Sequence, residues 1–310
     1  MLKYLLKRLL YIVPMFIILT FLVFAVLDLS PGDPVLMILG TTATTDQISA
    51  LTTELGLDQP LLVRYANYMI NMFKGDFGKS WLTGNSVAVE MGQRMVNTIR
   101  LALGALLLTV IIGIPLGVLA AVYQNGPVDR ITLVSALFFI SMPEFFIALI
   151  CQLVFALRFG WLPATGADTF KHFILPTLML AAAQIAGQIR MTRSSMLDVI
   201  SQDYIRTAYA KGDNKYRVIT HHALRNGLMP VVTGIGNAVA RLISGAAVIE
   251  IVFAIPGMGN MMVSAVQTSD VPMVMGPIII IALWVMLVNT IVDMIYAFID
   301  PRVKLRFAKG

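Results

Sequence analysis

The sequence predicts an all-α integral membrane protein with six spanning helices. Hydrophobic residues make up 58% of the 310 residues, charged residues only 13%, and the mean hydropathy is +0.81. A soluble domain carries roughly 25% charged residues, so this chain has too little polar surface to dissolve in water. Several apolar stretches also reach about 20 residues, which is the length that crosses a bilayer as a helix.

Six apolar stretches have this length. The first could be mistaken for a signal peptide, because Lys3, Lys7 and Arg8 precede it. It is longer than the apolar region of a signal peptide and no small-residue cleavage site follows it, so we expect an uncleaved span. The fourth stretch is weaker because it contains Ala, Gly and Gln. The predicted spans are residues 9–29, 101–123, 131–157, 173–190, 228–253 and 277–298.

The basic residues predict the orientation of these spans. Cytoplasmic loops of membrane proteins are enriched in Lys and Arg. With the N-terminus in the cytoplasm, the cytoplasmic segments hold 15 of the 23 Lys and Arg residues, and the outer segments hold more acidic residues than the cytoplasmic ones. Both termini are then cytoplasmic, which requires an even number of spans in the cell (inner, cytoplasmic) membrane. The net charge of +6 therefore reflects the placement of basic residues on the cytoplasmic side. We expect contact with membrane lipid and no nucleic-acid partner. The cytoplasmic segments are 1–8, 124–130, about 190–227 and 299–310.

Two loops are too long to be simple connections. Residues 30–98 mix short amphipathic stretches with turn signals and predict a small, mainly helical external subdomain after the first span. We therefore expect one domain at 1–98, formed by the first span and this subdomain. A second domain at 99–310 would hold the other five spans and a cytoplasmic loop at about 192–227.

The cytoplasmic loop predicts two short helices. Apolar residues recur at helical spacing from Met196 to Ala208. Lys211 and Gly212 then form a typical helix stop. A second helix is expected over 215–225, ending at Asn226–Gly227. One alternative is an amphipathic loop on the lipid surface. A DNA-binding helix-turn-helix is disfavoured because both ends of the loop are tethered to spans.

The sequence of this loop resembles a known family. Asp203-Tyr204-Ile205-Arg206-Thr207-Ala208-Tyr209-Ala210-Lys211-Gly212, followed by His222-Ala223-Leu224-Arg225-Asn226, is similar to the EAA loop of ABC importer permeases. The match is to the dipeptide, oligopeptide, nickel and glutathione transport family, whose members are binding-protein-dependent inner membrane components. Tyr209 replaces a commoner Arg, and 267–272 departs from the usual Arg-Asp-Tyr-Pro motif. Further matches are Pro31-Gly32-Asp33-Pro34, residues 55–61 and 75–80, Trp161-Leu162-Pro163, Leu175-Pro176-Thr177-Leu178, Pro256-Gly257-Met258-Gly259 and Asp300-Pro301-Arg302.

The resemblance covers essentially the whole chain and implies a function. It implies a type-1 permease fold and the membrane subunit of an ATP-driven importer that works by alternating access. The implied partners are a second homologous permease, two cytoplasmic ATP-binding subunits and an extracytoplasmic solute-binding protein. The implied solutes are peptides or related small solutes of the dipeptide, oligopeptide, glutathione or nickel-chelate class.

The resemblance also implies that the loop couples to the ATP-binding subunits. A short helix with an apolar face suits docking in a groove. Tyr204, Ile205 and Ala208 are the expected anchors, and Arg206 and Lys211 the expected polar contacts. The coupling residues carried over by the match are Asp203, Tyr204, Ile205, Arg206, Thr207, Ala208, Lys211 and Gly212.

Charged and polar residues within the spans are functional candidates, because they are costly in lipid. The candidates for the solute path are Glu144, Gln184, Gln188 and Asp293. Pro143 favours a kink just before Glu144. The alternatives are an interfacial position for Glu144 and a structural ion pair for Asp293. For Arg241 and Glu250, a structural pair is at least as favoured as a solute contact.

Small residues on the spans predict close helix packing. Gly113 and Gly117 form a GxxxG pattern on the second span. Such patterns let helix backbones approach each other.

No catalytic motif is present. The sequence contains no phosphate-binding glycine loop and no HExxH. Its single cysteine and three histidines form no metal-ligand pattern. We therefore expect a non-catalytic subunit without cofactor or metal. The alternatives are a secondary transporter driven by an ion gradient, which would show inverted repeats, and an intramembrane enzyme.

Overall fold

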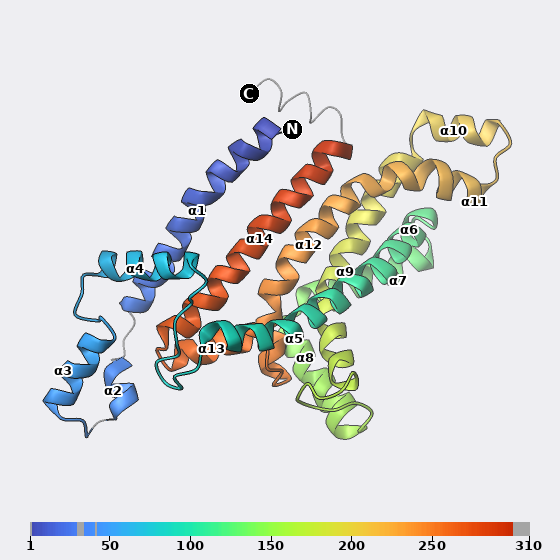
Figure 1. Cartoon of the computed structure of the whole chain (residues 1–310). Coiled ribbons are helices and arrows are strands. Elements are labelled where there is room, and N and C mark those ends of the chain that lie inside the picture. The colour runs from blue at the N-terminus through green and yellow to red at the C-terminus, as the bar shows by residue number, and fades with distance from the viewer. Residues whose placement is uncertain (1, 30–33, 41, 300–310) are drawn as a thin grey trace. The chain divides into compact units, whose positions relative to one another are not determined.

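The computed structural model describes residues 2–29, 34–40 and 42–299, and these ranges are almost entirely helical (Figure 1). Within them there is no strand, and the only β-type pairing is an isolated antiparallel bridge between Lys79 and Ser86. The all-α prediction is confirmed. The helices are α1 Leu2–Asp28, α2 Pro34–Leu39, α3 Thr45–Glu54, α4 Leu61–Phe73, α5 Val87–Leu108, α6 Ile114–Val122, α7 Pro127–Ser141, α8 Glu144–Cys151, α9 Lys171–Ile200, α10 Asp203–Ala210, α11 Lys215–Arg217, α12 Leu224–Val252, α13 Met258–Gln267 and α14 Val271–Ile299, with π-helical turns at Thr109–Gly113, Gln152–Arg158 and Val218–Ala223.

Parts of the predicted sites fall outside this description. The motifs Pro31-Gly32-Asp33 and Asp300-Pro301-Arg302 lie outside the described residues. The side chain of Asp293 is also outside the described part of the chain, although its backbone belongs to α14.

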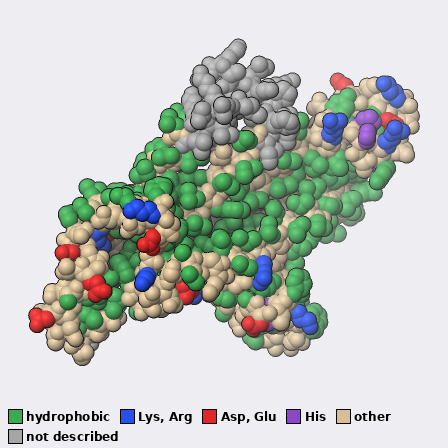
Figure 2. All heavy atoms as spheres, viewed as in Figure 1, with side chains coloured by type: hydrophobic (Ala, Val, Ile, Leu, Met, Phe, Trp, Pro, Cys, Tyr) green, Lys and Arg blue, Asp and Glu red, His purple; other side chains and the backbone are tan. Residues whose placement is uncertain are grey.

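The helices supply the six predicted spans. Four are long and apolar enough to cross a membrane: Leu10–Asp28, Val87–Val122, Lys171–Ile200 and Val271–Val292. Two bent helix pairs are also long and apolar enough when each pair is taken as one span. They are Pro127–Ser141 with Glu144–Arg158, and Lys215–Ile243 with Gly245–Val252. Figure 2 shows mainly hydrophobic side chains over the long helices, whereas charged side chains gather around α2–α4 and around α10 and α11.

The third span is broken more sharply than the sequence predicts. A continuous, kinked helix was expected over 131–157, but α7 and α8 meet at a bend of 103°. Met142 is extended, with φ −93° and ψ 139°. Pro143 disfavours helical geometry in the residue before it and has no N–H to donate. Glu144 therefore begins a new helix.

Other helix boundaries also differ from the predictions. The helix of the second span begins at Val87, earlier than predicted. Residues 87–100 are amphipathic, and their polar side chains explain why hydropathy alone did not predict them as part of the span. The helix that begins at Lys215 does not end at Asn226–Gly227 but continues to Val252. Gly227 instead allows close packing, since a Cβ there would lie 2.5 Å from the sulfur of Met196.

The first compact unit comprises residues 1–98 and 256–286. Its core is formed by α1, α4 and the first half of α14, with Phe16, Phe24, Met69 and Ile279 buried. The Tyr65 hydroxyl lies 2.8 Å from that of Thr20 on α1. This contact helps to fix α4 against α1.

A buried carboxylate organises another corner of this unit. Asp270 is 3% exposed and accepts hydrogen bonds from the Ser80 hydroxyl at 2.5 Å and the Trp81 amide at 3.3 Å. It lies in the segment that departs from the usual family motif. Asp270 ties the turn before α5 to the turn between α13 and α14.

The second unit comprises residues 99–255 and 287–310, described as far as 299. Its central helix is α9, which packs against α6, α7 and α12. Buried residues of this core include Leu101, Ala181, Leu242, Ile249 and Phe253. All the described candidate residues of the solute path and of the cytoplasmic loop belong to this unit.

The predicted close packing at Gly113 and Gly117 is confirmed. A Cβ at Gly113 would lie 2.9 Å from Cβ of Gln188, and one at Gly117 would lie 2.6 Å from Cβ of Thr192. The Gly117 position also faces the Ile189 carbonyl at 2.8 Å. Because a backbone atom cannot move aside like a side-chain end, Gly117 has no room for a larger residue.

Gly117→Ala is expected to destabilise the protein by about 1–3 kcal/mol through overpacking between α6 and α9. Gly92→Ala is the control, because Gly92 is also helical but has open space around the position of a Cβ. That change should be neutral, or stabilising by up to about 1 kcal/mol. The measurement is thermal unfolding of the detergent-purified variants. Equal melting temperatures for Gly117→Ala and the unchanged protein would contradict the tight contact.

Candidate functional site

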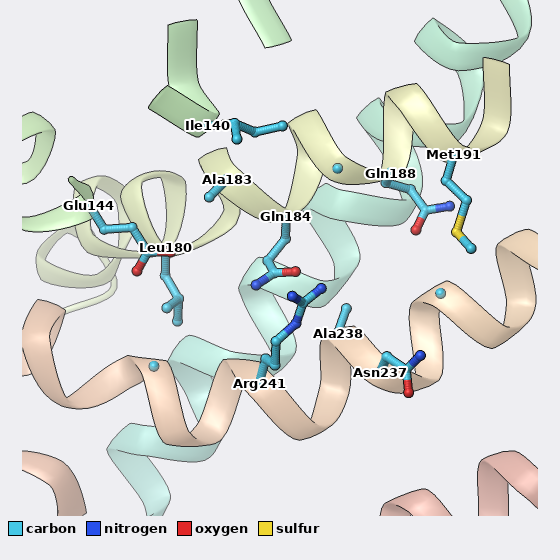
Figure 3. Close-up of a pocket in the computed structure, with 13 residues that line it drawn as sticks. Ile140, Glu144, Leu180, Ala183, Gln184, Gln188, Met191, Asn237, Ala238 and Arg241 are labelled. Atoms are coloured by element: carbon cyan, nitrogen blue, oxygen red, sulfur yellow. The ribbon is translucent and has the colours of Figure 1, made fainter. Parts of the chain in front are cut away.

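A polar cavity of about 630 Å³ lies among α8, α9 and α12 (Figure 3). Its wall combines polar side chains with small residues that leave space between the helices. The polar lining residues are Glu144 from α8, Gln184 and Gln188 from α9, and Asn237 and Arg241 from α12.

The spacing of these residues explains why the helices leave a cavity. On α9, the lining residues Ala183, Gln184, Gly187 and Gln188 recur on one helical face. On α12, the positions of Gly234, Asn237, Ala238, Arg241 and Gly245 do the same. Both faces alternate small residues with polar ones, so the two helices face each other without filling the space between them.

The polar side chains of the wall differ in orientation and exposure. Gln184 and Arg241 point toward one another from α9 and α12 (Figure 3). Gln188 is only 4% exposed, and its amide donates to the Thr192 hydroxyl at 3.3 Å. Gln188 is therefore a bonded wall residue, and the side chain of Arg241 is exposed in the isolated chain.

Three predicted path residues, Glu144, Gln184 and Gln188, thus line one cavity. Sequence reasoning did not assign Asn237 or Arg241 to the path. Their signal was present in the sequence: a charge within a span, four residues from an amide, on a face of small residues. Only the packing of α9 against α12 shows that this face meets Gln184.

The predicted helix stop at Lys211 and Gly212 is confirmed. After α10, the Gly212 amide donates to the Tyr209 carbonyl at 3.0 Å and the Asp213 amide to the Ala208 carbonyl at 3.2 Å. These two bonds form a Schellman motif. Gly212 has φ +90°, a conformation that residues with a Cβ rarely adopt.

The apolar face of α10 is turned inward. Ile205 is 1% exposed and Ala208 is 7% exposed, and both share a core with Met196, Val218 and Ala223. The prediction that Ile205 and Ala208 anchor the helix in a partner's groove is therefore wrong, since they anchor it to their own chain. The predicted loop residues that remain exposed are Asp203, Tyr204, Arg206, Thr207, Lys211 and Gly212.

Side chains also connect the loop to the helix that follows. The Asn226 side-chain amide donates to the Tyr204 hydroxyl at 2.9 Å. Nε2 of His222 lies 3.0 Å from the carboxylate of Asp213. The Asn214 side chain accepts from the Arg217 amide at 2.8 Å and caps the start of α11.

Comparison with known proteins identifies the family. The family model described as "Binding-protein-dependent transport system inner membrane component" matches residues 113–305, and the model of the N-terminal part of such membrane components matches residues 1–102. The chain belongs to this family. It is the permease subunit of an ABC importer and a multi-pass protein of the inner membrane.

The relatives span the full length of this permease. It is 39% identical to the glutathione transport system permease protein GsiC of Salmonella typhimurium over 306 residues, which is 99% of this chain and 100% of that protein. It is 40% identical to GsiC of Escherichia coli (strain K12) over the same share of each chain. These matches overturn the alternative of a secondary transporter.

A solved structure supports the fold. A chain of the MetNI methionine ABC transporter, in an inward-facing conformation, matches with a TM-score of 0.58 at 16% identity. The match covers 68% of this permease and 96% of that chain. The type-1 permease fold implied by the sequence is therefore confirmed.

A buried ion pair of the permease escaped sequence reasoning. Arg193 on α9 donates two hydrogen bonds to Asp129 on α7, at 2.6 and 2.8 Å. The Asp129 side chain is 3% exposed and also accepts from the Asn125 amide at 2.8 Å. Asn125 has φ +63°, so the carboxylate stabilises the turn between α6 and α7 and ties it to α9.

Proposed function

We propose that this permease carries peptides or related small solutes across the cytoplasmic membrane by alternating access. The solute classes are dipeptides, oligopeptides, glutathione and nickel chelates, and ATP hydrolysis by separate subunits drives transport. The observation that carries the proposal is the polar cavity with Arg241 and Glu144 in its wall. The glutathione permeases among the relatives support the same solute class.

The chemistry of the cavity fits such solutes. Its volume of about 630 Å³ falls in the usual range for small-molecule sites. The fork of Arg241 suits a solute carboxylate, which it can bind with two parallel hydrogen bonds. Glu144 suits an ammonium group, and the side-chain amides of Gln184 and Asn237 can both donate to and accept from peptide groups.

The proposed assembly follows from the family. A permease that depends on a binding protein and on ATP works with a solute-binding protein and with ATP-binding subunits. We propose a second homologous permease and two cytoplasmic ATP-binding subunits as partners. Both termini would be cytoplasmic, residues 1–98 would form the first span and an external subdomain, and 99–310 would form the permease domain. The subunit itself would be non-catalytic.

The proposed contact with the ATP-binding subunits is the outward face of the loop around α10. Asp203, Tyr204, Arg206, Thr207 and Lys211 are exposed there. The buried side chains of Ile205 and Ala208 support the helix from below, and Gly212 sets the turn after it. The loop is thus presented as a preformed element whose position depends on the permease core.

Tagged permease, gently solubilised from its host membrane, is expected to recover a second permease and ATP-binding subunits. Proteoliposomes with the recovered complex and its binding protein should take up peptide only when ATP is supplied. The control is the same complex with a non-hydrolysable ATP analogue. Recovery of the permease alone, with uptake that continues without ATP, would refute the proposal.

Arg241→Gln is expected to raise the KM for peptide uptake about 10- to 100-fold, because a charge-assisted bidentate contact is lost. Arg241→Lys should fall between, since it keeps the charge but not the planar fork. Arg130→Gln makes the same change at an exposed position of α7 and should leave KM unchanged. Radiolabelled dipeptide uptake measures the effect, and an unchanged KM in Arg241→Gln would remove Arg241 from the solute path.

Gly212→Val is expected to uncouple ATP hydrolysis from transport while the ATP-binding subunits still co-purify. Valine resists φ +90°, so the turn after α10 must change and redirect the helix. Gly212→Asn is the matched control, because asparagine tolerates left-handed backbone and should keep most transport. The ratio of ATP hydrolysed to solute transported is measured in proteoliposomes. Wild-type coupling in Gly212→Val would count against the role of this turn.

A further inference from the structure

The helix α10 is bonded to the following helix near both of its ends. Near its start, the Tyr204 hydroxyl accepts from the Asn226 side chain at 2.9 Å. Just beyond its end, the Asp213 carboxylate accepts from Nε2 of His222 at 3.0 Å. We call these two bonds the loop clamp.

The two donor residues lie on one face of the following helix. His222 and Asn226 are four residues apart, which places them one above the other on a helix. Between the two bonds, α10 packs along the Val218–Ala223 segment of this helix. Ile205 and Ala208 are buried in the same contact. Figure 1 shows α10 beside the beginning of this helix. The loop clamp therefore fixes the position of α10 along it.

The connection of α10 to the preceding helix is looser. Gln202 between α9 and α10 is extended, with φ −76° and ψ 148°. The side chains of Ser201 and Gln202 both donate to the Asp198 carbonyl, so they cap α9 and do not reach α10. Met196, Leu197, Val199 and Ile200 of α9 belong to or pack against the apolar core below α10. Apolar contact is non-directional, however, whereas hydrogen bonds fix relative position.

The clamped helix also carries the cavity wall. From Asn226 the same helix continues through Asn237 to Arg241, a rise of about 16 Å to Asn237 at 1.5 Å per residue. Its bend, at Ile243 to Gly245, comes only after Arg241. A displacement of its cytoplasmic end therefore reaches Asn237 and Arg241 through continuous helix.

We propose that the loop clamp makes α10 move as one body with the helix that begins at Lys215. Displacement of α10 is thereby passed to the α12 side of the cavity. Tyr204, Asp213, His222 and Asn226 are positioning residues in this step. The proposal rests on the proposed function, because it requires that α10 contact the ATP-binding subunits.

The first test is a double-mutant cycle at the Tyr204–Asn226 bond in the complete reconstituted transporter. Tyr204→Phe and Asn226→Ala are each expected to raise the ATP hydrolysed per dipeptide transported about 3- to 10-fold. The ATP-to-dipeptide ratio of the double variant should be no higher than that of either single variant, because both changes remove the same hydrogen bond. Recovery of the ATP-binding subunits should stay unchanged in Asn226→Ala, because Asn226 does not belong to the proposed contact with those subunits.

Tyr209→Phe is the matched control for this cycle. It removes a hydroxyl from the same helix at a similar exposure, 43% for Tyr209 against 41% for Tyr204. The Tyr209 hydroxyl does not belong to the loop clamp, so the ratio of ATP to solute should remain that of the unchanged protein.

The second test addresses the other end of the clamp. Asp213→Ala removes the acceptor for His222 and should raise the ATP-to-solute ratio about 3- to 10-fold. Asp213→Asn keeps an acceptor oxygen at the same place and should restore most of the coupling. A residue that mattered only for folding would lower protein yield instead, without changing this ratio.

Two results would overturn the loop clamp. One is a normal ATP-to-solute ratio in both Asn226→Ala and Asp213→Ala. The other is loss of the ATP-binding subunits from these variants, which would assign the bonds to docking instead of transmission. Failure of the unchanged permease to recover ATP-binding subunits is a separate outcome, because it would refute the proposed function itself.

Discussion

In the hydrocarbon core of a bilayer, water cannot satisfy a backbone N–H or C=O group, so each must find its partner within the protein. Helices meet this requirement within one segment, and the described spans are all helical. Once the backbone groups are hydrogen-bonded, the hydrophobic effect no longer favours one helix contact over another, because lipid tails are as apolar as leucine side chains. Helix packing then depends on shape and on a few polar contacts. The close approach of α6 and α9 at Gly117 is such a shape contact.

Polar contacts complete the packing at the ends of the spans. The Asp129–Arg193 pair joins the turn between α6 and α7 to α9. Asp270 joins two turns of the other unit in a similar way. In each case one buried carboxylate accepts bonds from a distant segment and from a nearby amide, that of Asn125 for Asp129 and that of Met273 for Asp270. Removal of either carboxylate would leave buried donors unsatisfied, which is more costly than the net gain from the bonds suggests.

The same requirement explains where function can be placed. A break in a spanning helix is tolerated where its free backbone groups face a cavity or other protein. The break at Met142–Pro143 turns Glu144 into the first residue of α8 and puts it in the wall of the polar cavity. Arg241 and Gln184 complete this wall from α12 and α9. In the proposed mechanism, one helix carries both Arg241 and the hydrogen bonds to α10, so movement of α10 reaches the cavity.

Composition, periodicity and charge distribution determined the all-α membrane class, the six spans and the positions of most apolar segments. Short motifs determined the family and the helix stop at Gly212, because glycine is the residue that most readily adopts the left-handed backbone of such a turn. The tertiary structure decided which polar residues meet. Nothing local to α12 shows that Arg241 faces Gln184, and nothing in α10 shows that its apolar face is already covered by Val218 and Ala223. A helix pattern shows that one face is apolar, but only packing shows whether the chain itself or a partner covers that face.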